Sequence, residues 1–509
     1  MNQRKAGVVL SYLSMGLQSI IGLIYVPVLL IFLSKEEYGL YQLVGSVIAY
    51  LMIMDFGLAG TTVRYLSRFT AQNNQKAKEN LLAVTTYLYF GISFIIIITG
   101  IAGLNFLLPF YSKTLSPYEI VLAKQIFWIM LFNVAIVIPG NIFSAIIQAS
   151  EKFVFLRTVN IINIVLQPAL VFAVLYFKSS LVAMVIVQTL CNVCVITANA
   201  YYSMYKLKTN IKFHYWDKPL VKEILFFSFF IFLNALMDQV YWKTGQLILG
   251  AVSGTAVVAV YAVAMQLDMM FMNFSSNISS VFLPHLSALS AGKNNMNEIN
   301  NIFVKVGRIQ FYIVMLMFLG FWLYGKEFIN FWVGADFKEA YLCALVLMGA
   351  LVIPLIQNTG ISILLAKNKH AFRAVIYVLI AVLNVTVSIP VSKYYGAFGC
   401  ALTTAACLIL GQGIIINIYY SKIGIKVLYF FKNIISSLPP VLAVFFIALI
   451  SKQYIPQKSI VFFILQIVVF CFLFFAAVWS FSFNSYEKNL VAGSFKKVYN
   501  KVLKRKDRI

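Results

Sequence analysis

Apolar runs of about 20 residues recur along the whole sequence, and they limit what this chain can fold into. As a helix, each run is long enough to cross a hydrocarbon core of about 30 Å. Of the 509 residues, 61% are hydrophobic and 11% are charged, and the mean hydropathy is +0.88. No region is long and polar enough to form a separate soluble domain. The sequence therefore predicts an all-α integral membrane protein.

The hydropathy pattern predicts about 14 transmembrane helices joined by short connections. The connections hold turn-forming residues, as at 34–37 and 178–180. Arg4 and Lys5 precede the first run, which continues as a full span, so we expect an uncleaved first helix. The expected spans are 8–33, 39–60, 81–108, 120–149, 154–177, 181–204, 224–250, 255–284, 309–333, 340–366, 373–392, 396–420, 433–451 and 459–481.

Lysine and arginine are distributed unequally between alternate connections. About 30 of the 40 fall in the set that includes both termini, and about nine fall in the opposite set. By the positive-inside rule, the rich set is cytoplasmic, so both termini are expected in the cytoplasm. The net charge of +24 is thus spread over short loops, which indicates topology and no nucleic-acid partner. Lys243 is the one Lys or Arg that we assign neither to a loop nor to the end of a span.

The sequence offers little support for an enzyme or a metalloprotein. The three histidines are scattered, and no glycine-rich phosphate loop is present. The pair Cys191 and Cys194 lies in an apolar run without a soluble redox or zinc context, so we interpret it as apolar filling. A glycan polymerase would be expected to carry a large outer loop, and every outer loop here is short. We expect no catalytic residues, no metal and no cofactor.

Two pairs of short segments match at nearly equal spacing. SKEEYGLY at 34–41 resembles GTAVVAVY at 254–261, and IIQASEKFVF at 146–155 resembles ILLAKNKHAF at 363–372. Each displacement covers six spans, an even number, so the repeats are parallel. We expect two pseudo-symmetric six-helix lobes, at 1–222 and 223–425. A C-terminal pair of further helices at 426–485 and a basic cytoplasmic tail at 486–509 complete the prediction.

Several of these segments resemble a known superfamily. The two lobes, MDFGLAGTTVRYLSRF at 54–69, the ILLAKNKH junction and YYGAFGCALTTAA at 394–406 are similar to the multidrug/oligosaccharidyl-lipid/polysaccharide exporter superfamily. The two extra helices and the stretch 238–267 are most similar to bacterial polysaccharide flippases. The resemblance implies a flippase that moves undecaprenyl-diphosphate-linked repeat units of O-antigen or capsule to the outer leaflet of a bacterial plasma membrane.

The resemblance also implies partners and leaves an alternative open. The expected partners are the lipid-linked oligosaccharide, membrane lipids, a coupling H⁺ or Na⁺, and glycan polymerase machinery. The alternative is a cation-coupled multidrug exporter of the same superfamily, because fold does not fix function. The two extra helices and the strongly basic net charge favour the flippase.

The seventh span contains the candidate substrate-binding residues. A lipid diphosphate needs a wet, partly cationic cleft, because a charge without partners is prohibitive in hydrocarbon. Gln239, Lys243 and Gln246 share one helix face, next to the face that carries Asp238. Such a polar face either lines a pathway or joins helices as structural contacts. Arg64, at the cytoplasmic end of span two, is a further candidate, or an ordinary positive-inside anchor.

Acidic residues in the spans are the candidates for ion coupling or gating. Asp238 and Asp268 fall near the expected midplane, and Asp55 falls nearer the cytoplasmic face, where it either gates or contacts Arg64 or Arg68. Pro27 interrupts the backbone bonding of span one. Related transporters bend this helix, so the resemblance implies a hinge at Pro27.

The charge asymmetry predicts that the connection 205–222 is cytoplasmic. A Lys212→Cys variant in intact cells should then resist a membrane-impermeant thiol reagent applied from outside. The same reagent should label it after the membrane is opened. Efficient labelling in sealed cells would reverse the assigned orientation.

Overall fold

The computed structural model describes residues 3–290, 296–367, 369, 371–454, 460–489 and 492–493. Within these residues every regular element is helical and no strand occurs, so the predicted all-α class is confirmed. The elements are α1 (Gln3–Phe32), α2 (Lys35–Met52), η1 (Ile53–Asp55), α3 (Leu58–Ala71), α4 (Gln75–Tyr111), α5 (Pro117–Ala149), α6 (Phe153–Phe177), α7 (Leu181–Tyr201), η2 (Tyr202–Lys206), α8 (Lys218–Val252), α9 (Thr255–Ser290), α10 (Met296–Trp332), η3 (Ala335–Phe337), α11 (Lys338–Ile356), α12 (Thr359–Ala366), α13 (Ala371–Leu408), η4 (Ile409–Ile415), α14 (Ile416–Lys422), α15 (Val427–Ile435), α16 (Leu438–Tyr454), α17 (Ile460–Ala477) and η5 (Val478–Ser482).

In the described part of the chain, 12 helices are long and apolar enough to cross a membrane, or 13 when the bent pair α15 and α16 counts as one span. One of these candidates, Ala371–Lys422, has 52 residues. It covers two expected spans, and Gly396, with φ of 53°, interrupts it. At about 1.5 Å per residue it is more than twice as long as a hydrocarbon core. Dividing it at Gly396 brings the count to the expected 14.

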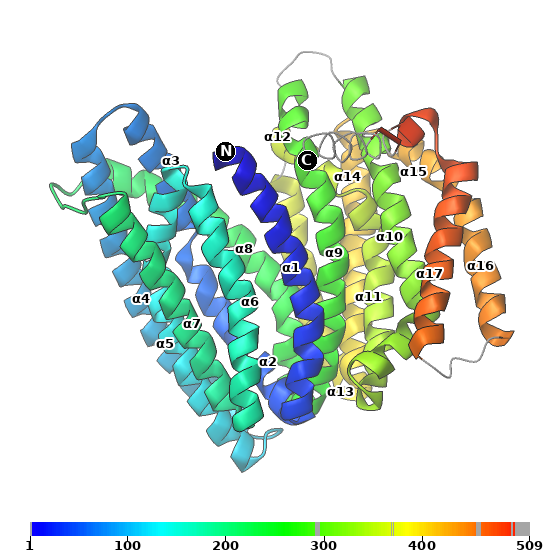
Figure 1. Cartoon of the computed structure of the whole chain (residues 1–509), viewed down its shortest axis with the longest axis horizontal. Coiled ribbons are helices and arrows are strands. Elements are labelled where there is room, and N and C mark those ends of the chain that lie inside the picture. The colour runs from blue at the N-terminus through cyan, green and yellow to red at the C-terminus, as the bar shows by residue number, and fades with distance from the viewer. Residues whose placement is uncertain are drawn as a thin grey trace, which may run out of the picture. The chain divides into compact units, whose positions relative to one another are not determined.

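The chain divides into two compact units, which are described separately. Unit 1 comprises residues 1–263 and 381–400, and unit 2 comprises 264–380 and 401–509. In unit 1, α5 packs against α2, α3, α4 and α7, while α1 lies along α6 (Figure 1). The six-helix lobes at 1–222 and 223–425 stay a prediction, because the units group residues by contact and not by sequence repeat.

Close backbone packing holds the start of α9 in unit 1. A β-carbon at Gly39 of α2 would clash with the backbone carbonyl of Thr255. The Thr255 hydroxyl donates to Glu119 at 2.5 Å, and Glu119 also completes the capping box of α5 with Ser116. Thr114 donates to the Gly250 carbonyl at 2.7 Å. Together these contacts fix the turn between α8 and α9 to α2, to α5 and to the connection between α4 and α5.

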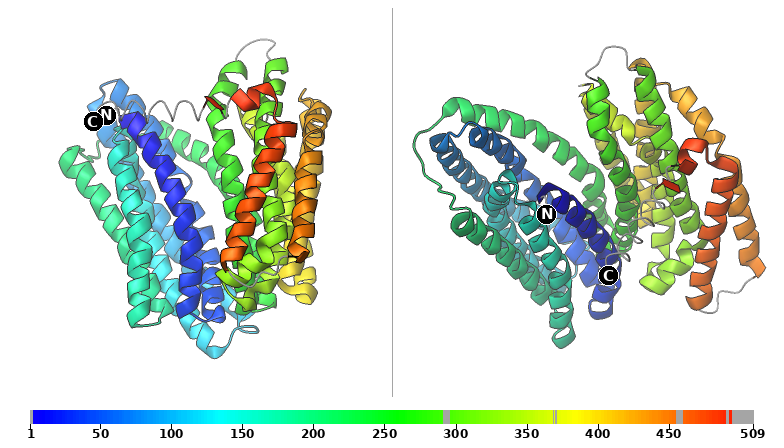
Figure 2. Two further views of the ribbon diagram at one scale, coloured as in Figure 1. Left: turned by 45° about the vertical axis from the view of Figure 1, so that its right-hand side comes forward. Right: turned by 45° about the horizontal axis from the view of Figure 1, so that its top comes forward.

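In unit 2, α10 is the helix on which the others assemble. It contacts α11, α12, α15, α16 and α17. Aromatic rings fill its contacts with the last two helices: Trp322 meets Phe445 of α16 with ring centroids 5.5 Å apart, and Tyr324 meets Phe470 of α17 at 6.0 Å. Figure 2 shows α16 and α17 side by side. The expected C-terminal helix pair therefore exists and packs on α10.

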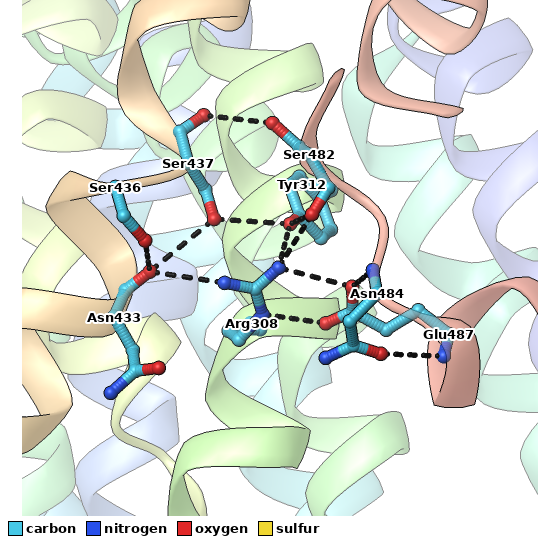
Figure 3. A network of polar contacts seen from close by, with 8 residues as sticks. All are labelled: Arg308, Tyr312, Asn433, Ser436, Ser437, Ser482, Asn484 and Glu487. Carbon is cyan, nitrogen blue, oxygen red and sulfur yellow. Dashed lines mark hydrogen bonds and ion pairs between the residues drawn. The ribbon is translucent and has the colours of Figure 1, made fainter. Parts of the chain in front are cut away.

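A buried ion pair ties α10 to the residues that follow α17. Arg308 donates to Glu487 through Nε at 2.6 Å and Nη2 at 3.1 Å, and both side chains are buried. The guanidinium also donates to the carbonyls of Asn433 (3.2 Å) and Ser482 (2.7 Å) and to the hydroxyl of Tyr312 (2.8 Å). Figure 3 shows this network, which joins α10, the bend between α15 and α16, and the end of η5.

A second ion pair holds the other end of α10. Glu327 lies 2.8 Å from Lys452 near the end of α16, and both side chains are about a quarter exposed. Arg308 and Glu327 are about 28 Å apart along the helix axis at 1.5 Å per residue. This separation is close to the hydrocarbon thickness of about 30 Å. The basic tail expected at 486–509 lies mostly outside the described residues.

Removing one member of the buried pair should destabilise the protein strongly. Glu487→Ala leaves the Arg308 guanidinium buried without its carboxylate, which costs about 3 to 5 kcal/mol. Lys452→Ala is the matched control, and loss of its more exposed pair should cost only about 0 to 1 kcal/mol. Thermal unfolding in detergent, followed by the fraction of monodisperse protein after heating, measures both. Equal stability of the two variants would refute the ranking.

Candidate functional site

The candidate site centres on α8, which lies along the second span in unit 1. The hydroxyl groups of Thr244 and Tyr50 share a hydrogen bond of 2.5 Å, and those of Ser228 and Thr61 share one of 3.2 Å. Ser46 donates to the side-chain oxygen of Gln246. These contacts lie on α2 and α3 and fix the rotation of α8 about its own axis.

The second span is broken where α8 crosses it. Phe56 and Gly57 adopt left-handed φ values of 53° and 66°. Such angles suit glycine, and a β-carbon on Gly57 would meet the side chain of Ile231 at 2.6 Å. Asp55 ends the short η1 helix at this break, and its Oδ1 accepts from Asn141 Nδ2 at 3.3 Å. Asp55 therefore joins the break to α5, a contact that the sequence did not indicate.

Lys243 lies at membrane depth on α8 with its side chain partly buried. Within the residues that the structure describes, its ammonium group makes no hydrogen bond or ion pair. Gln239, one turn earlier, has a buried side-chain oxygen that also lacks a hydrogen-bond partner. Unsatisfied polar groups in such a place are costly, which is why they are candidates for binding a ligand.

The structure separates the three residues that share this face in the sequence. Gln246 is only 2% exposed and engages Ser46, so in this conformation it is a contact between helices. The side-chain oxygen of Gln239 keeps unused bonding capacity. Asp238 is exposed on a neighbouring face.

Arg64 and Pro27 occupy other parts of unit 1. Arg64 is exposed on α3, and its guanidinium lies 5.8 Å from the ring centre of Tyr65. Pro27 lies inside the continuous helix α1. Near it, Tyr25 accepts from Gln188 at 2.9 Å, and Tyr41 donates to Gln188 at 3.2 Å. This bridge joins α1, α2 and α7.

Asp268 is the candidate ion-coupling residue in unit 2. It is fully buried on α9, and neither carboxyl oxygen has a hydrogen-bond partner among the described residues. Ser275 and Ser279, about two and three turns further along α9, face Gln310 of α10. Gln310 donates to the hydroxyls of Ser275 (3.1 Å) and Ser279 (2.6 Å). Asp268 thus contrasts with these two hydroxyls on the same helix, although the side-chain oxygen of Gln310 also lacks a partner among the described residues.

Sequence reasoning missed several of the strongest polar contacts. Arg308 counts as a loop charge in the hydropathy pattern, yet it lies within α10 and is 7% exposed. Gln357 of the α11–α12 connection and Asn417 of α14 exchange amide hydrogen bonds of 2.8 and 3.0 Å. The available signal was an isolated polar residue at the edge of an apolar run, which does not identify its partner. No group of three or more His, Cys, Asp or Glu that could hold a metal occurs among the described residues.

Comparison with solved structures shows the fold. The lipid II flippase MurJ in an inward closed conformation matches with a TM-score of 0.73 and 16% identity, over 92% of this chain and 98% of that one. An inward-facing multidrug resistance MATE transporter of the MOP superfamily matches with a TM-score of 0.64 and 14% identity, over 81% and 96%. A MOP superfamily transporter from Pyrococcus furiosus matches with a TM-score of 0.57 and 15% identity, over 83% and 97%.

A comparison with curated protein sequences gave no match. A family model described as polysaccharide biosynthesis protein matches residues 5–290, more than half of the chain. The solved structures that match are flippases and transporters and not enzymes. The resemblance found in the sequence is therefore confirmed for the family and the fold. This multi-pass membrane protein belongs to the polysaccharide biosynthesis protein family.

Proposed function

We propose that this protein flips undecaprenyl-diphosphate-linked oligosaccharide repeat units from the inner to the outer leaflet of a bacterial plasma membrane. It does so by alternating access, coupled to H⁺ or Na⁺. The family match carries the proposal, because that family is described by polysaccharide biosynthesis. The substrate presents a diphosphate, a polar glycan and a long apolar tail, so the path needs a cation and bonding groups for the head.

Lys243 supplies that cation, with Gln239 beside it. A partly buried ammonium without a carboxylate partner can bind an anion without first breaking an ion pair. Gln239 adds a polar group one turn away that also lacks a partner. Arg64 is the second proposed contact for the diphosphate, and Gln246 the second for the glycan, which it reaches when its bond to Ser46 opens.

Asp268 carries the proposed ion coupling. An ionised carboxylate that is buried without partners is strongly disfavoured, whereas a protonated or Na⁺-bound carboxyl removes most of that cost. Binding and release of the ion would then favour different conformations. Asp238 and Asp55 are the further proposed coupling or gating groups, and Pro27 is the proposed hinge of α1.

The alternative function is a cation-coupled multidrug exporter, which the match to MATE transporters favours. The two functions differ in their substrates. Expression in a drug-hypersensitive strain should leave its drug tolerance unchanged if the protein is a glycan flippase. Increased tolerance to several unrelated cationic drugs, without any effect on surface glycan, would support the exporter instead.

Lys243→Ala should accumulate normally but lose transport. Losing one charged contact to the diphosphate corresponds to about 1.5 to 3 kcal/mol, or about 10- to 100-fold in transport at limiting substrate. Lys243→Arg should keep part of the activity because the charge remains. Lys124→Ala, at an exposed position of α5, is the control and should export normally.

Surface glycan measured against protein level distinguishes these outcomes. Full export by Lys243→Ala at native protein level would exclude its role. If the variant instead fails to accumulate, the double variant Lys243→Ala with Asp238→Asn decides, since neutralising both members rescues a structural pair. Rescue of both accumulation and export would show that Lys243 is structural.

Asp268→Asn should uncouple transport from the ion gradient. The amide resembles the carboxyl in shape but cannot bind a proton or Na⁺ in exchange. In proteoliposomes, the wild type should respond to an imposed pH or Na⁺ gradient and the variant to neither. Its thermal stability should equal or exceed that of the wild type, because the neutral amide cannot become a buried charge. An unchanged gradient response would contradict the coupling role.

A further inference from the structure

An open groove runs between α6 and α7 in unit 1. It has a volume of about 390 Å³ and is lined only by residues of these two helices. Cys191, 7% exposed, lies at its floor, while the exposed side chains of Ile162, Leu166 and Leu190 form its rim. Helices α6 and α7 are neighbours in Figure 1.

The chemistry of the lining excludes a polar ligand. No charged residue lines the groove, and its one amide side chain is Asn163. The Asn163 amide donates to Gln167 on the same helix at 3.4 Å, so one of its donors is used within α6. A sugar or a diphosphate would lose its hydrogen bonds to water here without replacement. A hydrocarbon chain makes no hydrogen bonds to water, so it would lose none in the groove.

The length of the groove selects the kind of hydrocarbon. From Val159 to Val174 it extends about 22 Å along α6 at 1.5 Å per residue. One leaflet of the hydrocarbon core is only about 15 Å thick. The acyl chain of a phospholipid stays within its own leaflet, whereas a long isoprenoid chain can pass the midplane. The groove therefore fits a chain longer than those of ordinary lipids.

The charge at one end of α6 agrees with this occupant. Arg157 lies on the first turns of α6, two residues before the groove begins. This is the end that the distribution of basic residues assigns to the cytoplasm. An anionic headgroup attached to a chain in the groove would meet positive charge at that end, in the leaflet where the proposed substrate begins.

We infer that the groove between α6 and α7 binds the long isoprenoid tail of the substrate while the headgroup is transported. This inference rests on the proposed function and adds a second binding surface to it. The tail remains in an apolar environment throughout, so only the head needs the polar path. Tail length, and not only the headgroup, then contributes to substrate selection.

Photocrosslinking of the purified full-length protein tests the inference. The probe is a long-chain polyprenyl diphosphate that carries a diazirine in its tail. It should label peptides that contain residues 159–174 and 187–198, and unlabelled long-chain polyprenyl phosphate should compete. Farnesyl diphosphate and a diazirine-bearing diacyl phosphatidylglycerol should compete or label there only weakly.

A matched pair of variants on α7 locates the binding. Cys194 is exposed and lines the groove, so Cys194→Trp places its ring over the groove without filling the core. Labelling should fall about tenfold, which corresponds to the lost burial of roughly two methylene groups. Ile186→Trp, at an exposed position on the same helix outside the groove, should label as the wild type does.

The possible failures have different meanings. Equal labelling of the groove by the diacyl probe, or no loss with Cys194→Trp in a monodisperse protein, would overturn the tail-binding inference. Labelling by the polyprenyl probe at other helices alone would do the same and leave the flippase proposal intact. If the polyprenyl probe labels the protein nowhere above the diacyl background, the proposed function itself fails.

Discussion

The hydrocarbon core of a bilayer contains no water, so a polar group at membrane depth needs a partner within the protein. This constraint explains how unit 2 is arranged around α10. Arg308 and Glu327 lie about one hydrocarbon thickness apart on that helix, and each forms an ion pair with the C-terminal helix pair or the residues beyond it. The two ion pairs fix the position of α16 and α17 along the axis of α10. Aromatic contacts fill the apolar region of α10 between the two pairs.

The same rule accounts for the polar contacts between the other helices. Gln310 reaches two serines of α9, and Gln357 and Asn417 satisfy each other. In unit 1, α8 is held on the second span by hydroxyl contacts at Thr244 and Ser228. Hydrogen bonds of this kind give each helix one rotation about its axis, because any other rotation would leave a polar group in lipid.

Against this background, three residues are informative. Among the described residues, the side-chain oxygen of Gln239 and both carboxyl oxygens of Asp268 are buried without hydrogen-bond partners, which costs free energy. Lys243 lies partly buried beside Gln239 on α8. Gln246, by contrast, has a partner in Ser46. Lys243 suits an anionic head, the Gln239 oxygen can accept from glycan hydroxyls, and Asp268 suits a small cation. The groove between α6 and α7 is the apolar complement, since it fits the part of the substrate that needs no partner.

The sequence by itself determined the class of protein, because the length of an apolar run and the placement of Lys and Arg report directly on the bilayer. Apolar runs predicted the helices, including the two that meet at Gly396, and the quoted segments indicated the family. Periodicity also brought Gln239, Lys243 and Gln246 onto one face. It did not show that Gln246 is hydrogen-bonded to α2, that Asp55 contacts Asn141, or that Arg308 is buried against Glu487. Those facts depend on which helices become neighbours. The pairing partners lie 86 to 200 positions apart in the chain, so no local pattern encodes them, and only the packed tertiary structure decides which polar groups are satisfied and which remain available.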